Sequence, residues 1–286
     1  MRAFGGEALI LDVFDLHETD RIVTLLTRER GKTKGVARGA RRKYSRFAGQ
    51  LQPLARVRVR WFEKEGRELV RIGDVELVRP AHRLQQDLEG ILLGSYLAEH
   101  LTEIVQENEP SELYFRLLDS TVEALLEGVD RDLAARYFEA WALRLAGIFP
   151  APRECPLCGR PFPERGGVLP PGDEAVVCAD CAASGSGMGA AGAAGGGRPG
   201  IVGASLGLPV DSEVLGLLVR LGREPLAELA RRPPAARVLR RTERLNAEVR
   251  RRFLGKELRS YDVIQSLRPV LDPASGGTKG PAAPTR

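Results

Sequence analysis

The sequence lacks any long apolar run. No stretch approaches the roughly 18 to 20 consecutive apolar residues that a helix needs to span a membrane. The opening residues, MRAFGGEALILDVFDL, lack the apolar core and small-residue cleavage site of a secretory signal peptide. We therefore expect a cytoplasmic protein that has no membrane partner.

Motifs of common catalytic sites are also missing. The glycine-rich stretches do not match a phosphate-binding loop, no segment reads His-Glu-x-x-His, and no acidic cluster suits a two-metal nuclease. The histidines are scattered, at His17, His82 and His100. We therefore expect a protein that is not an enzyme. Four acidic residues near the N-terminus are interpreted as turn residues: Asp12, Asp15, Glu18 and Asp20.

Cysteine is scarce, and the four that occur all lie between positions 155 and 181. They form two Cys-x-x-Cys pairs, Cys155 with Cys158 and Cys178 with Cys181, with 19 residues between the pairs. This spacing is typical of four-thiolate zinc sites, whose filled coordination shell makes the metal structural rather than catalytic. Two disulfides or a redox pair are the less favoured alternatives. We predict one structural Zn²⁺ bound by these four thiolates.

Residues 1–80 have the pattern of β-strands. Short apolar and β-branched runs alternate with glycine-containing or charged turns. In the run 56–61, a strand would place Val57, Val59 and Trp61 on one face and three arginines on the other. We predict a small β-domain in which one face is core and the other carries a cationic stripe, formed by Arg56, Arg58 and Arg60.

The rest of the chain is mostly helical in pattern. Helical periodicity extends over 81–150, with Ser111 as an N-cap, and resumes over 205–272. The cysteine segment 151–183 and a flexible glycine-rich loop, 184–204, interrupt it, and 273–286 has the composition of a disordered tail. The predicted fold is therefore α+β, with an N-terminal β-barrel, a helical bundle and an inserted four-cysteine zinc module.

Positive charge is concentrated in one segment, although the net charge is only +5. Residues 28–46 contain nine Lys or Arg against one acid, and their glycines allow the backbone to approach a polyanion closely. Phosphates neutralised by such side chains release counterions, which favours binding. The alternative is a solvated charged surface. The residues expected to bind DNA are Lys32, Lys34, Arg38, Arg41, Arg42, Lys43, Arg46, Arg58 and Arg60.

Two aromatic residues lie in or beside this segment. Tyr44 and Phe47 are candidates for stacking on bases, and core packing is the equal alternative for each. The sequence has no device for reading particular bases, such as a recognition helix with Asn or Gln near its N-terminus. Binding is therefore expected to follow backbone and shape.

The basic segment also carries a family resemblance. Residues 31–42, GKTKGVARGARR, followed by 45–53, SRFAGQLQP, resemble the N-terminal signature of RecO, the bacterial recombination mediator family. Further similarity lies in EALIL and DRIV near the start, GIFP before the first cysteine pair and LGKELRS near the end. The resemblance extends over nearly the whole chain, in the same order.

This resemblance implies an N-terminal OB-fold, a helical bundle and a zinc module. It implies a DNA repair and recombination mediator that binds single- and double-stranded DNA, anneals complementary strands and acts in the cytoplasm at the nucleoid. The implied partners are RecR and the acidic tail of single-stranded-DNA-binding protein, with which the family loads RecA. By motif match, Lys34, Arg38, Arg41 and Lys43 would contact DNA, and the four cysteines match the zinc ligands of metal-bearing members.

Several alternatives stay open at this point. An OB-fold with a zinc module also suits RNA, so an RNA-binding factor is the second hypothesis. A metal-dependent nuclease that uses Asp12 or Asp20 and a zinc-stabilised adaptor are further ones. A second basic surface is predicted over 237–259, where it would hold a second strand or an acidic partner. The alternative is an exposed helix face with a few compensating acids. Its members are Arg240, Arg241, Arg244, Arg250, Arg251 and Arg252.

Overall fold

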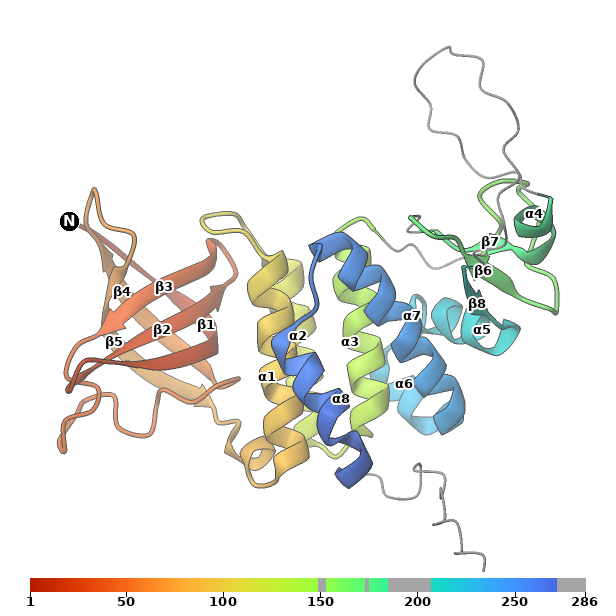
Figure 1. The fold of residues 1–286 in the computed structure, drawn as a ribbon. Helices are drawn as coiled ribbons and strands as arrows, with labels where there is room; N and C mark the ends of the chain where they lie inside the picture. Colours follow the sequence, from red (N-terminus) through yellow and green to blue (C-terminus); the bar gives the residue numbers. More distant parts are fainter. Residues whose placement is uncertain (149–152, 173–174, 185–206, 272–286) are drawn as a thin grey trace, which may run out of the picture.

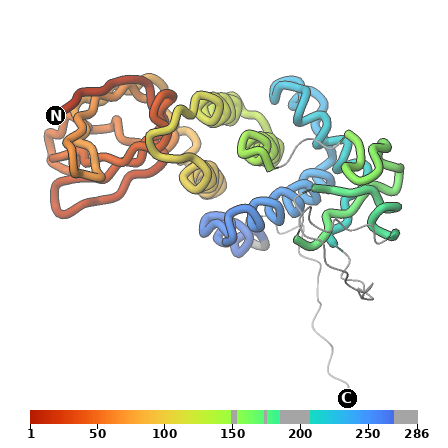
Figure 2. Tube along the Cα trace, turned by 90° about the horizontal axis from the view of Figure 1, so that it is seen from above, coloured from red at the N-terminus to blue at the C-terminus, as the bar shows by residue number. Residues whose placement is uncertain are grey.

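The computed structural model describes residues 1–148, 153–172, 175–184 and 207–271. A β-barrel lies at one end, helices fill the middle, and the cysteine segment lies at the other end (Figure 1, Figure 2). The mixed α+β prediction is confirmed. The predicted flexible loop, apart from Ser184, and the predicted tail 273–286 lie outside the described residues. Every helix in the described part is too short or too polar to cross a bilayer.

Five N-terminal strands close into a barrel in the order β1-β2-β3-β5-β4. Closure depends on a short parallel pairing of β3 with β5, in which Gly35 lies opposite Val70. Side chains such as Ile10, Leu25 and Trp61 fill the interior. The strands are β1 (Arg2–Leu16), β2 (Asp20–Thr27), β3 (Gly31–Ala37), β4 (Arg56–Glu63) and β5 (Val70–Arg79).

Part of the basic segment forms a strand that periodicity does not predict. Its residues 31–37 are β3, which pairs with β2 along its whole length. Gly35 interrupts the apolar alternation because β5 passes too close for a side chain. A Cβ at Gly35 would lie 2.6 Å from Cδ1 of Ile72. The interpretation of Asp12 and Asp15 as turn residues is wrong, since both lie within β1.

The outer face of β1 and β2 packs against the helices. Leu9, Leu11 and Leu26 belong to the core of the helical part, whereas their neighbours Ile10 and Leu25 belong to the barrel core. Both faces of these strands are therefore covered, which explains the unbroken apolar run in β1. The helices are η1 (His82–Gln85), α1 (Leu88–Ile104), α2 (Glu112–Leu126), α3 (Arg131–Leu145), α5 (Ser212–Leu221), α6 (Leu226–Arg231), α7 (Ala236–Leu254) and α8 (Arg259–Leu271).

Aspartates begin three of these helices. The carboxylates of Asp87, Asp130 and Asp211 each accept a hydrogen bond from the backbone N–H three residues later. Ser111 stands at the predicted N-cap position of α2 but makes no capping bond, because its hydroxyl donates to the carbonyl of Glu109. The first N–H groups of α8 are satisfied by Glu99 of α1, a residue distant in the chain.

A buried polar network lies between α1, α3 and α7. The guanidinium of Arg250 is fully buried and donates to the hydroxyl of Tyr96 at 2.5 Å, and Tyr96 donates to Glu139 at 2.6 Å. Burial lowers the pKa of the neighbouring His100 to about 3, so this imidazole is neutral. Arg250 also pairs with Glu257. The prediction that Arg250 belongs to a basic surface is therefore wrong. The arginine-rich sequence of this helix does not show which of its arginines the fold buries.

The other arginines of that predicted surface are largely paired. Arg241 contacts Asp211 at 2.7 Å, and Arg251 contacts Glu248 at 2.8 Å. Arg252 also contacts Glu248 and donates to the carbonyl of Pro170 in the cysteine segment. Arg240 and Arg244 are exposed and have no ion pair in the described part of the chain, so the exposed face of α7 combines ion pairs with two free arginines.

The cysteine segment adds a small sheet and one short helix. Its strands β6 (Gly167–Leu169), β7 (Val177–Cys178) and β8 (Leu208–Val210) pair in the order β7-β6-β8, and α4 (Ala179–Ala183) follows β7 directly. In the chain, this segment lies between α3 and α5, which contact each other. β8 leads straight into the Asp211 cap of α5, so the sheet is joined rigidly to the helices.

We predict that Arg250→Met lowers the free energy of unfolding by about 3–5 kcal/mol, because it leaves the Glu257 carboxylate and the buried Tyr96 hydroxyl without the guanidinium that they contact. Arg244→Ala, on the same helix but exposed and without an ion pair, should change the free energy of unfolding by less than about 0.5 kcal/mol. Urea denaturation of both variants checks this. Equal stability of the two variants would contradict the role of the network.

Candidate nucleic-acid interface and metal centre

Some basic residues of the barrel hold it against the helices. Arg56 contacts Glu7 at 2.7 Å and Asp119 of α2 at 2.8 Å. Arg28 contacts Glu112 at 2.6 Å and lies over the ring of Phe115. These contacts form an interdomain clasp, which Arg79 completes through Asp119. Arg56 is therefore not available as part of a cationic stripe.

Lys32, a predicted DNA contact, also faces the helices. Its ammonium donates to the carbonyl of Thr102 near the end of α1 at 2.7 Å. Its backbone N–H donates to the carbonyl of Gln106 at 3.1 Å. Partial burial lowers the pKa of Lys32, mainly through desolvation. The structure thus gives Lys32 a place at the domain junction, apart from the exposed basic residues that follow it.

The segment after β3 displays charge on an apolar anchor. Ala40, Phe47 and Leu51 are buried in the barrel core and fix the turns of 38–55. The predicted contacts Arg38, Arg42 and Lys43 are exposed and have no ion pair within the described chain. Arg41 is tethered, since it contacts Asp15 at 3.3 Å and donates to the carbonyl of His17.

The two candidate stacking residues of this segment have different fates. Phe47 is only 2% exposed and belongs to the core, so its base-stacking hypothesis is wrong. Tyr44 is 90% exposed, beside Lys43, and its ring stays accessible. Phe47 packs in the barrel core, where a phenyl ring has no hydroxyl that would need a hydrogen-bond partner.

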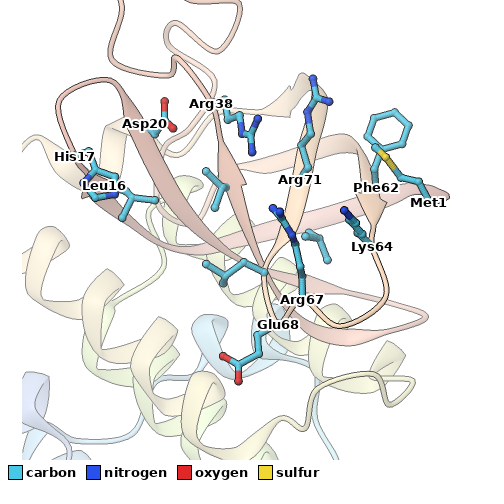
Figure 3. A pocket seen from close by; sticks show the side chains of 13 residues that line it. Met1, Leu16, His17, Asp20, Arg38, Phe62, Lys64, Arg67, Glu68 and Arg71 are labelled. Atoms are coloured by element: carbon cyan, nitrogen blue, oxygen red, sulfur yellow. The ribbon is translucent and has the colours of Figure 1, made fainter.

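A groove of about 600 Å³ lies on the surface of the barrel (Figure 3). It is built from the β1–β2 turn, the edge of β3 and the β4–β5 connection. Its floor is largely apolar and includes Leu16, Val36 and Phe62. Two acids, Asp20 and Glu68, lie in its walls. Four cations outnumber them, and none of these has an ion pair in the described part of the chain: Arg38, Lys64, Arg67 and Arg71.

Three of these cations are not among the DNA contacts that the sequence predicts. Lys64 and Arg67 lie in 64–69, KEGREL, where alternating charges resemble an ordinary solvated turn. Arg71 is an outward residue of β5. The strand alternation could have identified Arg71 as exposed, but nothing local places it near Arg38. Closure of the barrel does so, since Val36 pairs with Arg71 across β3 and β5.

Lys34 lines a second, smaller cleft next to the groove. Its ammonium lies 3.6 Å from the carboxylate of Glu107, in the connection between α1 and α2. The cleft has a volume of about 310 Å³ and shares Lys64 and Arg67 with the groove. Lys34 thus extends the line of cations from the groove towards the helices.

The remaining predicted contacts form an arginine–carboxylate ladder on the outer face of β4 and β5. Arg58 contacts Glu76 at 2.7 Å. Asp74 lies between Arg60 at 3.8 Å and Arg46 at 3.6 Å. The predicted alternation is confirmed, with Val57, Val59 and Trp61 buried. However, each outward arginine faces a carboxylate of β5, so the predicted cationic stripe is wrong: the ladder has little net charge.

The four cysteines come together as the spacing predicts. Their sulfur atoms all lie within 4.8 Å of one another, and those of Cys158 and Cys178 are 3.9 Å apart. Ligands of a tetrahedral zinc at about 2.3 Å would be separated by about 3.8 Å. The cluster therefore fits a small cation that prefers thiolates.

The surrounding backbone supports thiolates at this cluster. The N–H of Cys178 points at the sulfur of Cys155 at 3.3 Å, and the N–H of Cys181 at that of Cys178 at 3.4 Å. Hydrogen bonds from the backbone and side chain of Arg160 lower the pKa of Cys158 to about 6. Gly159 makes the turn after the first pair with a φ of +67°. Both Cys-x-x-Cys turns are thus shaped as metal knuckles.

Comparison with known proteins agrees with both regions. Residues 1–81 match the family model "Recombination protein O N terminal", and residues 85–262 match "Recombination protein O C terminal". The chain is 34% identical over 266 residues to the DNA repair protein RecO of Anaeromyxobacter sp. (strain K), covering 92% of this chain and 96% of that protein.

More distant bacteria supply further relatives. The DNA repair protein RecO of Myxococcus xanthus is 36% identical over 184 residues, 63% of this chain and 73% of its own. That of Geobacter sulfurreducens is 36% identical over 181 residues, 63% and 74% of the two chains. Since the two family models together match almost the whole described chain, this protein belongs to the RecO family, whose role lies in DNA repair and recombination.

Proposed function

We propose that the barrel is an OB-fold that binds single- and double-stranded DNA, and that the protein anneals complementary strands without chemistry. The observation that carries this proposal is the groove, where Arg38, Lys64, Arg67 and Arg71 stand unpaired around an apolar floor. Unpaired cations attract phosphates at no cost in broken ion pairs, and an apolar floor accepts bases of any sequence. OB-folds bind oligonucleotides at this place, between the corresponding strands and loops.

Annealing needs electrostatic screening rather than an energy source. Two complementary strands repel each other through their phosphates, and a cationic surface lowers this repulsion and raises the local strand concentration. Base pairing then proceeds by itself. The exposed set that would contact the backbone combines Lys34, Arg38, Arg41, Arg42 and Lys43 of the basic segment with the groove residues.

The wider role follows from the family. We propose that the protein acts in the cytoplasm at the nucleoid, with RecR, and engages the acidic tail of single-stranded-DNA-binding protein to help load RecA. In this role the protein would use three domains: the barrel (1–80), the helical bundle (81–150 and 205–272) and the cysteine module (151–183).

For the cysteine cluster we propose one structural Zn²⁺. Four thiolates would fill its coordination shell and leave no position for a substrate, so the ion would support the fold of the module alone. The nearby β8 and Arg252 connect the module to α5 and α7.

We expect the triple variant Lys34→Glu/Arg38→Glu/Arg41→Glu to bind DNA roughly 10- to 100-fold more weakly at about 0.1 M salt, with the salt slope reduced by about two, because three phosphate contacts are lost. The loss should be equal for unrelated sequences. Fluorescence anisotropy titrations at several salt concentrations measure both quantities.

A matched control is Arg83→Glu/Arg116→Glu/Arg244→Glu, which changes the net charge equally at exposed residues outside the barrel. This control should keep most of the affinity. If both triple variants lose the same affinity, the effect is one of overall charge, and the assigned interface is wrong.

The alternative function is binding of RNA, which an OB-fold with a metal module would also permit. Competition between DNA and RNA strands of one sequence separates the two. The groove has four cations for phosphates and an apolar floor for bases, and DNA and RNA share both of these groups, so we expect DNA to compete at least as well as RNA. Clear preference for RNA would favour the alternative.

Loss of the metal should affect stability and leave DNA binding intact. We expect the purified protein to contain one zinc per chain, and Cys155→Ser/Cys158→Ser to abolish it and lower the melting temperature. Because the module lies at the opposite end from the barrel (Figure 1), the DNA affinity of this variant should match that of the wild type. Metal analysis measures the zinc content, and fluorescence anisotropy measures the DNA affinity. A large loss of DNA affinity would contradict the proposal that the barrel binds DNA without the cysteine module.

A further inference from the structure

The arginine–carboxylate ladder differs from the interdomain clasp in its exposure. The side chains of Arg58 and Glu76 are 60% and 68% exposed, whereas those of Arg56 and Asp119 in the clasp are 27% and 13% exposed. Exposed ion pairs contribute only about 0.2–1 kcal/mol each, because water and salt screen them. The ladder is therefore too weak to be needed for the fold, and its arginines can exchange partners readily.

The ladder is also continuous with the groove. Arg58, Arg60 and Phe62 are successive outward residues of β4, and Phe62 lines the groove. On β5, Phe62 lies opposite Arg71, and Arg58 lies opposite Glu76. A polynucleotide that leaves the groove past Phe62 and Arg71 would therefore meet Arg60 and then Arg58 along the same two strands.

The carboxylates decide how this path behaves. In the groove, Asp20 and Glu68 also line the walls, but no cation lies within ion-pair distance of a carboxylate of the described chain, so a phosphate need not displace one. On the ladder, a phosphate must displace Asp74 from Arg46 and Arg60, or Glu76 from Arg58. The net gain for a phosphate is correspondingly smaller, although a phosphate can form the same bidentate pair with a guanidinium.

We propose that the arginine–carboxylate ladder is a second nucleic-acid track, masked by Asp74 and Glu76, that holds a second strand weakly beside the strand in the groove. This rests on the proposed function of the groove. Annealing requires one strand to be retained while another is sampled and released if it does not pair. The ladder would bind a strand more weakly than the groove does, because its arginines are paired with carboxylates, and both sites lie on one barrel.

The test removes the mask without changing side-chain shape, with Asp74→Asn/Glu76→Gln. Because three arginine–carboxylate contacts disappear, we expect a strand of about 30 nucleotides, long enough to pass from the groove onto the ladder, to bind roughly three- to tenfold more tightly. Its salt slope should steepen by about two, as more phosphates are neutralised. A strand of about six nucleotides, which the groove alone accommodates, should bind as it does to the wild type.

The control is Glu127→Gln/Asp262→Asn, which removes the same charge from exposed, unpaired residues of the helical part. It should leave both strands unaffected. Adding Arg58→Gln/Arg60→Gln to the unmasked variant should return the affinity for the long strand to the wild-type value.

The proposal is overturned if the unmasked variant binds the long strand no better than this control, or if short and long strands gain equally, which indicates a general field effect. Failure of the groove itself looks different. In that case the wild type would bind neither strand in a salt-dependent way, whereas failure of the ladder alone leaves wild-type binding unchanged and the unmasked variant without effect.

Discussion

The close parallel pairing of β3 with β5 is the contact on which the candidate interface depends. Gly35 permits it, because any Cβ there would collide with Ile72. Once the barrel is closed, Arg71 is placed beside Val36 and near Arg38, and the β4–β5 connection lies over the β1–β2 turn. The groove follows from this single approach of two backbones, whereas the ladder depends on the antiparallel pairing of β4 with β5.

The charges of the barrel are divided by their surroundings into three uses. Arg28, Lys32 and Arg56 are partly buried and hold the barrel to α1 and α2. The ladder arginines are exposed and paired, whereas the groove cations are exposed and unpaired. Burial and pairing, rather than the number of positive residues, therefore determine which of them a polyanion reaches. This division explains how a protein of small net charge can present a strong local anion site.

The rest of the molecule provides a rigid support. The buried network around Arg250 and Glu139 fixes α1, α3 and α7 to one another, since each of its charges is costly without its partner. The cysteine cluster, at the far end, is tied to the same helices through β8 and Arg252. The barrel, which we propose to bind DNA, and the cysteine cluster are thus separated in space and connected through the bundle.

The sequence by itself determined the features that depend on local spacing: the cysteine pairs, the alternation of Val57, Val59 and Trp61, and most helices, because thiolate spacing and residue period are properties of a short stretch. Only the tertiary structure decided which arginines are free. Arg58 meets Glu76, Arg250 enters the core, and Lys64 and Arg71 join Arg38, each through partners distant in the chain. A charge's effect depends on its neighbours in space and its exposure to water, and neither can be deduced from a charge count along the chain.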